Sequence, residues 1–166
     1  MQCHCFINFT VSFPLGKAHQ IISKRDNVFY VLGGRSLIFC SLRFKNDPLH
    51  SYYTSYFPMS VMACGLNDCW GIDSSGDLRY IITTSTCAIS LSSFSIFGDF
   101  VALDVSDNGV VYVIDANWKL YQSVGVRTNI SSWVALLPGK NIKSLSVDGD
   151  QLWLVTVEGT IMLCNV

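Results

Sequence analysis

The sequence predicts an all-β protein, a β-propeller with about four four-stranded blades and a repeat of about 41 residues. One observation is a set of aromatic residues that recur 41, 42 and 41 residues apart, namely Phe29, Trp70, Tyr112 and Trp153. A second is that an aliphatic residue follows each of them by eight positions across a short turn; these are Leu37, Leu78, Leu120 and Ile161. An all-β sandwich of similar composition, the alternative fold, gives no reason for such a period.

Each copy of the repeat consists of four short predicted strands, which the last copy shows most clearly. The first, at about 132–136, contains Trp133, and the second, at about 143–147, alternates polar and apolar residues. The third, at about 151–157, is almost continuously apolar, and the fourth, at about 160–164, follows a tight turn. Alternation is typical of a half-buried strand, and a short apolar run of a strand covered on both faces. One such sheet cannot bury both faces alone, so equivalent sheets must stack around an axis.

The four copies span nearly the whole chain, which we interpret as a single domain over residues 1–166. Their predicted bounds are about 6–43, 50–82, 92–124 and 131–166. If the first strand of each copy is the outermost strand of a blade, that strand belongs to the sheet of the preceding blade. The N-terminal strand near Phe9 would then pair beside the C-terminal strand and close a ring. The alternatives are a fragment of a larger ring, or an arc that pairs with another copy of the chain.

The composition limits the kinds of partner that the chain can bind. The formal net charge is −1, which excludes a global attraction to nucleic acid. Charged residues make up 14% of the chain, against about 25% in typical soluble domains. The chain therefore either buries its apolar residues efficiently or exposes apolar faces to missing blades or a partner.

The cysteines and the N-terminal sequence predict a cytoplasmic protein. The seven cysteines are an odd number and several fall in predicted strands, which favours reduced, buried thiols, including Cys64 and Cys69 at the ends of one hairpin. The N-terminal segment lacks a basic region and is a poor signal peptide. The sequence has no run of 18 apolar residues, so we do not expect a transmembrane helix.

The sequence does not predict an enzyme, a metal site or a cofactor. The three histidines have no metal-ligand partners at helix or hairpin spacing, and Cys3-His4-Cys5 lacks two further ligands for zinc. The aspartates at or beside turns are expected to accept hydrogen bonds from backbone amides rather than to act in acid–base chemistry. They are Asp73, Asp77, Asp104, Asp107, Asp148 and Asp150.

Candidate binding residues lie in predicted exposed loops. Trp118 falls in a turn of the third copy where the other copies have small or polar residues, and exposed aromatic side chains often anchor sugars or proteins. Basic residues in loops are usually solvated, but they also suit a phosphoinositide or an acidic partner. The complete set of candidates is Trp118, Arg127, Lys140, Lys143, Arg43 and Lys45.

The last two copies resemble the tectonin β-propeller repeat. The matching segments are Tyr121, Gly125-Val126-Arg127, Ser132-Trp133, Pro138-Gly139, Leu145-Ser146-Val147 and Leu152-Trp153-Leu154-Val155. The second copy matches in part, and the resemblance covers about residues 61–166. The chain contains no Trp-Asp or Gly-His pair, which weighs against WD40 blades.

The resemblance implies two kinds of function. Intracellular tectonin-repeat proteins are adaptors in autophagy and in endolysosomal or secretory traffic, with autophagy factors, tethering complexes and membrane lipids as partners. Secreted members are lectins that bind bacterial surface glycans. The cysteines favour a non-catalytic adaptor in the cytoplasm, associated with autophagosomal, endosomal or lysosomal membranes. The alternative is a glycan-binding lectin in innate defence, which single-domain length favours and which oxidised cysteines would support.

Overall fold

The computed structural model describes residues 18–24, 28–33, 37–42, 53–56, 58–83 and 89–165. In these ranges the chain forms three four-stranded sheets and one three-stranded sheet, and every strand pair is antiparallel. One short 3-10 helix, η1 (Arg127–Asn129), is the single helical element of the described residues. The prediction of an all-β fold is confirmed.

The sheets follow one another along the chain, and each is a simple up-and-down meander. The first contains β1 (Ala18–Lys24), β2 (Val28–Gly33), β3 (Leu37–Leu42) and β4 (Tyr53–Tyr56). The second contains β5 (Met59–Cys64), β6 (Cys69–Asp73), β7 (Leu78–Thr83) and β8 (Ile89–Ile96). The third contains β9 (Phe100–Val105), β10 (Val111–Asp115), β11 (Leu120–Val124) and β12 (Ser132–Leu136). The fourth contains β13 (Ile142–Asp148), β14 (Gln151–Thr156) and β15 (Ile161–Asn165).

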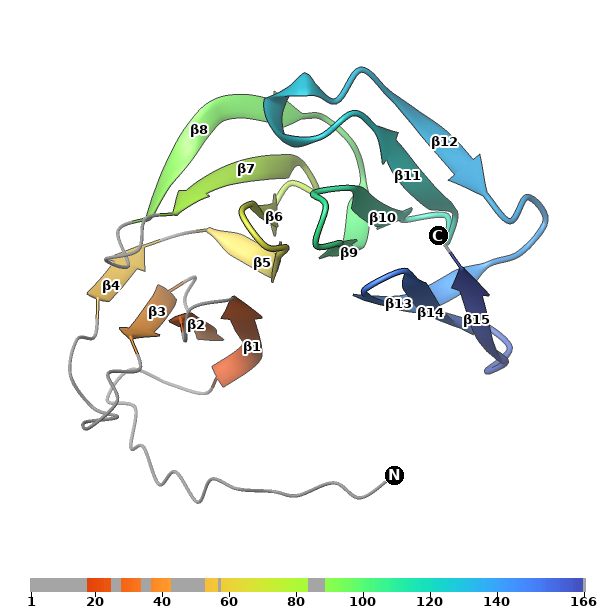
Figure 1. Ribbon diagram of the computed structural model, residues 1–166, viewed down its shortest axis with the longest axis horizontal. Coiled ribbons are helices and arrows are strands. Elements are labelled where there is room, and N and C mark those ends of the chain that lie inside the picture. The colour runs from red at the N-terminus through yellow and green to blue at the C-terminus, as the bar shows by residue number, and fades with distance from the viewer. Residues whose placement is uncertain are drawn as a thin grey trace.

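The four sheets are arranged as blades in an arc around a common axis (Figure 1). The first strand of each sheet lies innermost, and β1 contacts β5, β5 contacts β9, and β9 contacts β13. These strands begin at Ala18, Met59, Phe100 and Ile142, so their starts repeat every 41 or 42 residues. The arrangement is that of a β-propeller, as the period predicts.

The four aromatic residues that defined the period occupy the same strand of successive blades. Phe29 lies in β2, Trp70 in β6, Tyr112 in β10 and Trp153 in β14, each the second strand of its sheet. The blades are offset from the repeat copies by one strand, because Phe94 and Trp133 lie in β8 and β12, the outermost strands of the preceding sheets. The predicted closing strand near Phe9 lies outside the described residues.

Apolar side chains fill the spaces between neighbouring blades. Between the second and third blades, Trp70 meets the rings of Tyr80 and Phe94 edge-on, with centroids 5.1 and 6.0 Å away. The opposing surface consists of buried aliphatic residues from the third blade, namely Leu103, Val105, Val111 and Val113. A second core joins the third and fourth blades and contains Tyr112, Ile114, Leu120, Ile142, Leu152 and Leu154.

The hairpin turns between the second and third strands are stabilised by aspartates, as predicted for Asp73. The Oδ1 atom of Asp73 accepts hydrogen bonds from the backbone N–H groups of Ser75 and Asp77, at 2.9 and 3.1 Å. Asp115 binds its own turn in the same way, through the N–H groups of Asn117 and Lys119. The same local chemistry therefore shapes the turn in successive blades.

Two of these turns also bind the following blade. The carbonyl of Gly76 accepts a hydrogen bond from the N–H of Phe100, at 3.0 Å, and the carbonyl of Trp118 accepts one from the N–H of Ile142, at 2.8 Å. Both donors are the first residues of inner strands. Each turn therefore fixes where the next inner strand begins.

The cysteine prediction is wrong for one pair, because Cys64 and Cys69 form a disulfide. They are direct cross-strand partners at the ends of β5 and β6, with Cα atoms 4.1 Å apart. Such proximity places two sulfur atoms within bonding reach. The separation of only five residues across a hairpin was the signal in the sequence. Cys164 is a free thiol, and Cys3, Cys5 and Cys87 lie outside the described residues.

Reducing the Cys64–Cys69 disulfide is expected to lower the free energy of unfolding by about 2 kcal/mol, the loop-entropy value for so short a loop. Urea unfolding with and without a reductant measures the difference, and mass spectrometry reports whether the bond is oxidised. The Cys64→Ser/Cys69→Ser variant is the control, because a reductant should not change its stability. Equal stability of the oxidised and reduced chain would contradict the prediction.

Candidate functional site

Loops from several blades lie together at one end of the propeller and form a surface that we call the turn rim. It comprises residues 73–77, 97–99, 115–119, 138–142 and 156–160. Backbone hydrogen bonds connect these loops: besides the two bonds between blades, the N–H of Ala116 donates to the carbonyl of Asp99, at 2.7 Å, and the N–H of Val157 to that of Asn141, at 2.9 Å. The rim is therefore a continuous surface with a fixed backbone.

Trp118 occupies an unusual backbone conformation on the turn rim. Its φ is +64°, and its side chain is 40% exposed. The same position in the sister turns holds Gly76 and Gly159, with φ of +86° and +87°. A left-handed conformation costs a residue with a Cβ atom about 1–2 kcal/mol relative to the right-handed one. A bulky residue held there by the surrounding hydrogen bonds is the kind of local strain that accompanies function.

Phe97 is a second exposed aromatic residue on the rim, and the sequence analysis missed it. Its side chain is 81% exposed, the largest exposed fraction among the apolar side chains of the described residues. It lies two residues before Asp99, whose carbonyl binds the turn that carries Trp118. The rim therefore presents two aromatic rings to solvent from adjacent loops. A large apolar residue directly before Gly98, in a three-residue connection between strands, was the available signal.

Basic residues flank the Trp118 turn. Lys140 and Lys143 are exposed, and they lie on either side of Asn141 and Ile142, which bind the turn. The side chain of Lys119 donates to Oδ1 of Asn141, at 2.7 Å. Of the predicted binding residues, Trp118 and Lys140 therefore lie on the turn rim, and Lys143 lies just beyond it, on β13.

Arg127 lies elsewhere and joins two blades. Its Nε atom is 2.9 Å from Oδ1 of Asp68, a buried carboxylate of the second blade that also accepts a hydrogen bond from the Tyr80 hydroxyl. Burial and the hydrogen bond to Asp68 raise the pKa of Tyr80, so that its hydroxyl stays a donor. The guanidinium group is thus engaged between blades. The remaining candidates, Arg43 and Lys45, lie outside the described residues.

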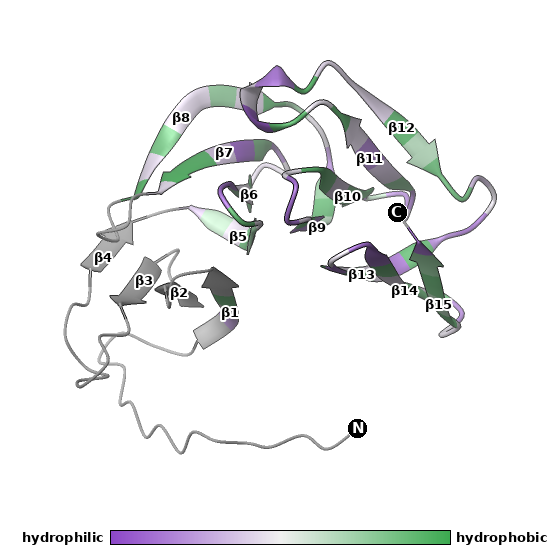
Figure 2. Ribbon diagram, in the orientation of Figure 1, coloured by the Kyte–Doolittle hydropathy of each residue, from purple (hydrophilic) through white to green (hydrophobic). Residues whose placement is uncertain are grey.

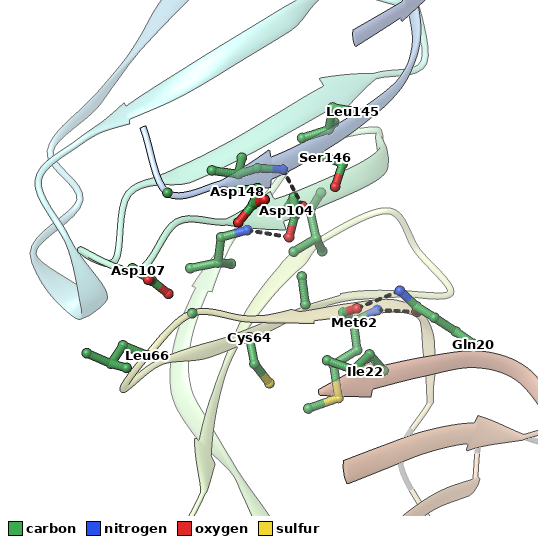
Figure 3. A pocket seen from close by; sticks show the side chains of 16 residues that line it. Gln20, Ile22, Met62, Cys64, Leu66, Asp104, Asp107, Leu145, Ser146 and Asp148 are labelled. Carbon is green, nitrogen blue, oxygen red and sulfur yellow. Dashed lines mark hydrogen bonds between the residues drawn. The ribbon is translucent and has the colours of Figure 1, made fainter. Parts of the chain in front are cut away.

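A polar cavity of about 640 Å³ lies beside the inner strands (Figure 3). Its walls come from β1, β5, β9, β13 and the turns that follow the last three, and they include Gln20, Met62, Asp104, Asp107, Ser146 and Asp148. The Gln20 amide exchanges two hydrogen bonds with the backbone of Met62, at 2.8 and 3.0 Å, and so connects the first blade to the second.

Asp104 connects the third and fourth blades across the same cavity. Its carboxylate accepts hydrogen bonds from the N–H groups of Val105 and Val147, both at 2.8 Å. Burial raises the pKa of Asp104, and these donors offset that effect only in part. The cavity's central carboxylate and amide are therefore already bound to the backbone, and their role is to hold inner strands together.

The described part of the chain contains no group of three or more His, Cys, Asp or Glu side chains placed to hold a metal ion. Within the same residues, no helix has the length and the apolar character needed to cross a membrane. Among the exposed features of the described residues, the aromatic and basic side chains of the turn rim suit the binding of another molecule.

Repeated sheets around an axis, with exposed loops gathered on one rim, define a β-propeller that serves as a binding module. The Tectonin domain family matches residues 20–157, and the chain belongs to this family. A curated relative is the fish-egg lectin of Cyprinus carpio, which is 30% identical over 112 residues. That match covers 64% of this chain and 47% of the lectin.

Solved structures share the fold at low sequence identity. Human WBSCR16 superposes with a TM-score of 0.65 at 14% identity, over 93% of this chain and 50% of that one. Yeast RCC1 bound to Kap60 gives a TM-score of 0.62 at 9% identity, over 93% and 45%. YCF48 from Cyanidioschyzon merolae gives 0.60 at 12%, over 92% and 52%. The chain therefore spans about half the length of the proteins that it matches.

Proposed function

We propose that this protein is a glycan-binding tectonin lectin and that the turn rim is its binding surface. The observation that carries the proposal is the tryptophan at a left-handed turn position where the sister turns have glycine. The fold does not need this side chain, because the interblade hydrogen bond uses the Trp118 carbonyl. A half-exposed indole offers a flat apolar face to the C–H groups of a sugar ring, while its N–H can bind a hydroxyl.

The neighbouring side chains suit a polar, partly charged ligand. Lys140 and Lys143 are exposed beside the Trp118 turn, and their ammonium groups can donate hydrogen bonds to hydroxyls and carboxylates. Phe97 adds a second apolar surface on the rim. The resemblance to a fish-egg lectin supports the same ligand class.

The Cys64–Cys69 disulfide supports the lectin over the adaptor. Disulfides persist in oxidising compartments and are rare in the cytosol. We therefore infer an oxidising environment for this chain, in place of the cytoplasmic location that the cysteine count favoured. The adaptor role in autophagy or membrane traffic stays a prediction, and no contact in the described residues favours it.

The test is a Trp118→Gly variant assayed for glycan binding. The wild-type chain is first screened on an array of bacterial and animal glycans, and the strongest hit is then titrated by calorimetry. We expect Trp118→Gly to weaken binding at least tenfold. Its stability should stay equal or rise by about 1 kcal/mol, because glycine relieves the left-handed strain.

Leu91→Ala is the matched control, since Leu91 is an exposed apolar residue on β8 outside the rim. Its glycan affinity should equal that of the wild-type chain. A wild-type chain that binds no glycan on the array would overturn the lectin proposal. A Trp118→Gly variant that binds as tightly as the wild-type chain would overturn the assignment of the rim.

A further inference from the structure

The loop that joins β11 to β12 contains an acceptor sequence for N-linked glycosylation. Residues 129–131 read Asn-Ile-Ser, which fits the pattern Asn-x-Ser/Thr in which x is not proline. Such a triplet often arises by chance. It is used only where the chain passes through the compartment that attaches oligosaccharides and where the asparagine can hold a bulky group at the surface.

The disulfide between Cys64 and Cys69 indicates that compartment. Disulfides form and persist in the secretory pathway and outside the cell, and they are rare in the cytosol. N-linked oligosaccharides are attached to proteins of the same pathway. The oxidising environment inferred from the disulfide is therefore also the environment in which the triplet at 129–131 can be modified.

Asn129 is exposed, and its side chain does not hold the fold together. An asparagine in a turn usually bonds to the nearby backbone, but the amide of Asn129 forms no hydrogen bond with any residue that the structure describes. The backbone forms the turn instead, because the N–H of Asn129 donates to the carbonyl of Val126, at 3.1 Å. A group attached to the Asn129 side chain therefore removes no interaction of the fold.

The residues on either side of Asn129 hold the loop against the protein. Arg127 pairs with Asp68 of the second blade, at 2.9 Å, and Ile130 packs against the apolar core between the second and third blades. The other two neighbours, Thr128 and Ser131, are exposed. Figure 2 shows this loop at the outer edge of the arc, with hydrophilic stretches. Asn129 therefore lies on the outer surface of an anchored loop, among exposed residues.

The loop and the turn rim lie at opposite ends of β11. This strand begins at Leu120, directly after the rim turn at 115–119, and ends at Val124, directly before the loop. A strand of five residues spans roughly 17 Å. An oligosaccharide on Asn129 is therefore compatible with a turn rim that stays open to ligands.

We propose that Asn129 carries an N-linked oligosaccharide, a site that rests on the oxidising compartment of the proposed function and not on what the turn rim binds. In the transfer, Nδ2 of Asn129 attacks the anomeric carbon of an oligosaccharide carried on a polyprenyl diphosphate. A carbon–nitrogen bond forms, and the bond between the anomeric carbon and the phosphate oxygen breaks. The lipid diphosphate leaves with the electron pair, and the amide nitrogen loses one proton to a base of the transferase. The hydroxyl of Ser131 completes the acceptor sequence.

The test is mass spectrometry of the full 166-residue chain made in a eukaryotic cell, where a cleavable signal sequence directs it into the secretory pathway. We expect the peptide that contains Asn129 to carry an oligosaccharide, which peptide N-glycosidase releases. Asn129→Gln and Ser131→Ala should each abolish this modification. Ser131→Thr should retain it, because a threonine hydroxyl also fits the acceptor sequence.

Thr128→Ala is the matched control, because Thr128 is an exposed neighbour in the same loop but lies outside the acceptor sequence. Its Asn129 should be modified to the same extent as in the wild-type chain. An unmodified Asn129, a modification confined to another asparagine, or an oligosaccharide that survives Ser131→Ala would each overturn the proposal. A chain that carries the oligosaccharide on Asn129 but binds no glycan on the array would support this site and overturn the lectin proposal alone.

Discussion

Replacing Trp70 with alanine is expected to lower the free energy of unfolding by about 3–5 kcal/mol, the usual cost of truncating a fully buried large aromatic residue. The Trp70 ring fills the space between the second and third blades and contacts Tyr80 and Phe94. Its removal would leave a cavity between two rigid sheets, which cannot move together without breaking the hydrogen bonds at the turn rim. Urea unfolding followed by circular dichroism measures the loss.

Trp153→Ala is the matched control for this prediction, because the two tryptophans hold the same repeat position. Trp153 is partly exposed, so its truncation in a dilute, monomeric sample should cost about 1 kcal/mol or less. A Trp70→Phe variant should lose less than Trp70→Ala, since it keeps most of the ring and removes an indole N–H that is buried without a hydrogen-bond partner. Equal losses at positions 70 and 153 would contradict the burial pattern.

Replacing Asp68 with alanine is expected to lower the free energy of unfolding by about 2–3 kcal/mol. The buried Asp68 carboxylate accepts a hydrogen bond from Tyr80 within its own blade and pairs with Arg127 of the next blade. The alanine variant leaves the Tyr80 hydroxyl without its acceptor and releases the guanidinium group from its position. Asp68→Asn should lose less, because an amide oxygen can still accept from Tyr80.

A double-mutant cycle with Arg127→Ala tests whether the pair connects the blades. We expect a coupling free energy of about 1 kcal/mol or more, measured by urea unfolding of the two single variants and the double variant. A coupling near zero would show that the pair does not stabilise the interface. The cycle also decides the binding assignment of Arg127: an interblade residue leaves glycan affinity unchanged on substitution, whereas a contact residue does not.

The fold could be predicted because the residues that repeat every 41 or 42 positions are those that each blade needs, either buried between blades or placed in its turns. Trp70 and Tyr112 recur at one spacing because each fills an equivalent space between blades. The glycines of the sister turns recur because those turns need a left-handed residue. The sequence did not decide whether the blades coincide with the repeat copies or are offset from them by one strand. Nothing in the strand that contains Phe94 indicates which of the two neighbouring sheets it will join.

The candidate site was harder to predict, because exposure depends on neighbours. Trp153 holds the same repeat position as Trp70, but among the described residues a further blade packs over Trp70 and none packs over Trp153. Arg127 resembles a solvated loop residue in the sequence, but Asp68, its partner, lies 59 positions earlier and meets it only through the stacking of two sheets. Phe97 went unnoticed because an isolated apolar residue in a loop is common and carries no periodic signal. The exposure of Trp118 was predictable, because the repeat shows what its turn position holds in other blades, whereas its role in binding stays a prediction.

The interblade hydrogen bonds of the turn rim use carbonyl oxygens, so the side chain at that position takes no part in them. A side chain there must tolerate a left-handed backbone, and where it does so, as at Trp118, the interblade hydrogen bond still forms. A scaffold of this kind presents one variable position per blade, about 41 residues apart in the chain and regularly spaced around the axis. Ligands with repeating units, such as polysaccharides on a cell surface, could then engage several positions at once, and weak individual contacts would add up to high avidity.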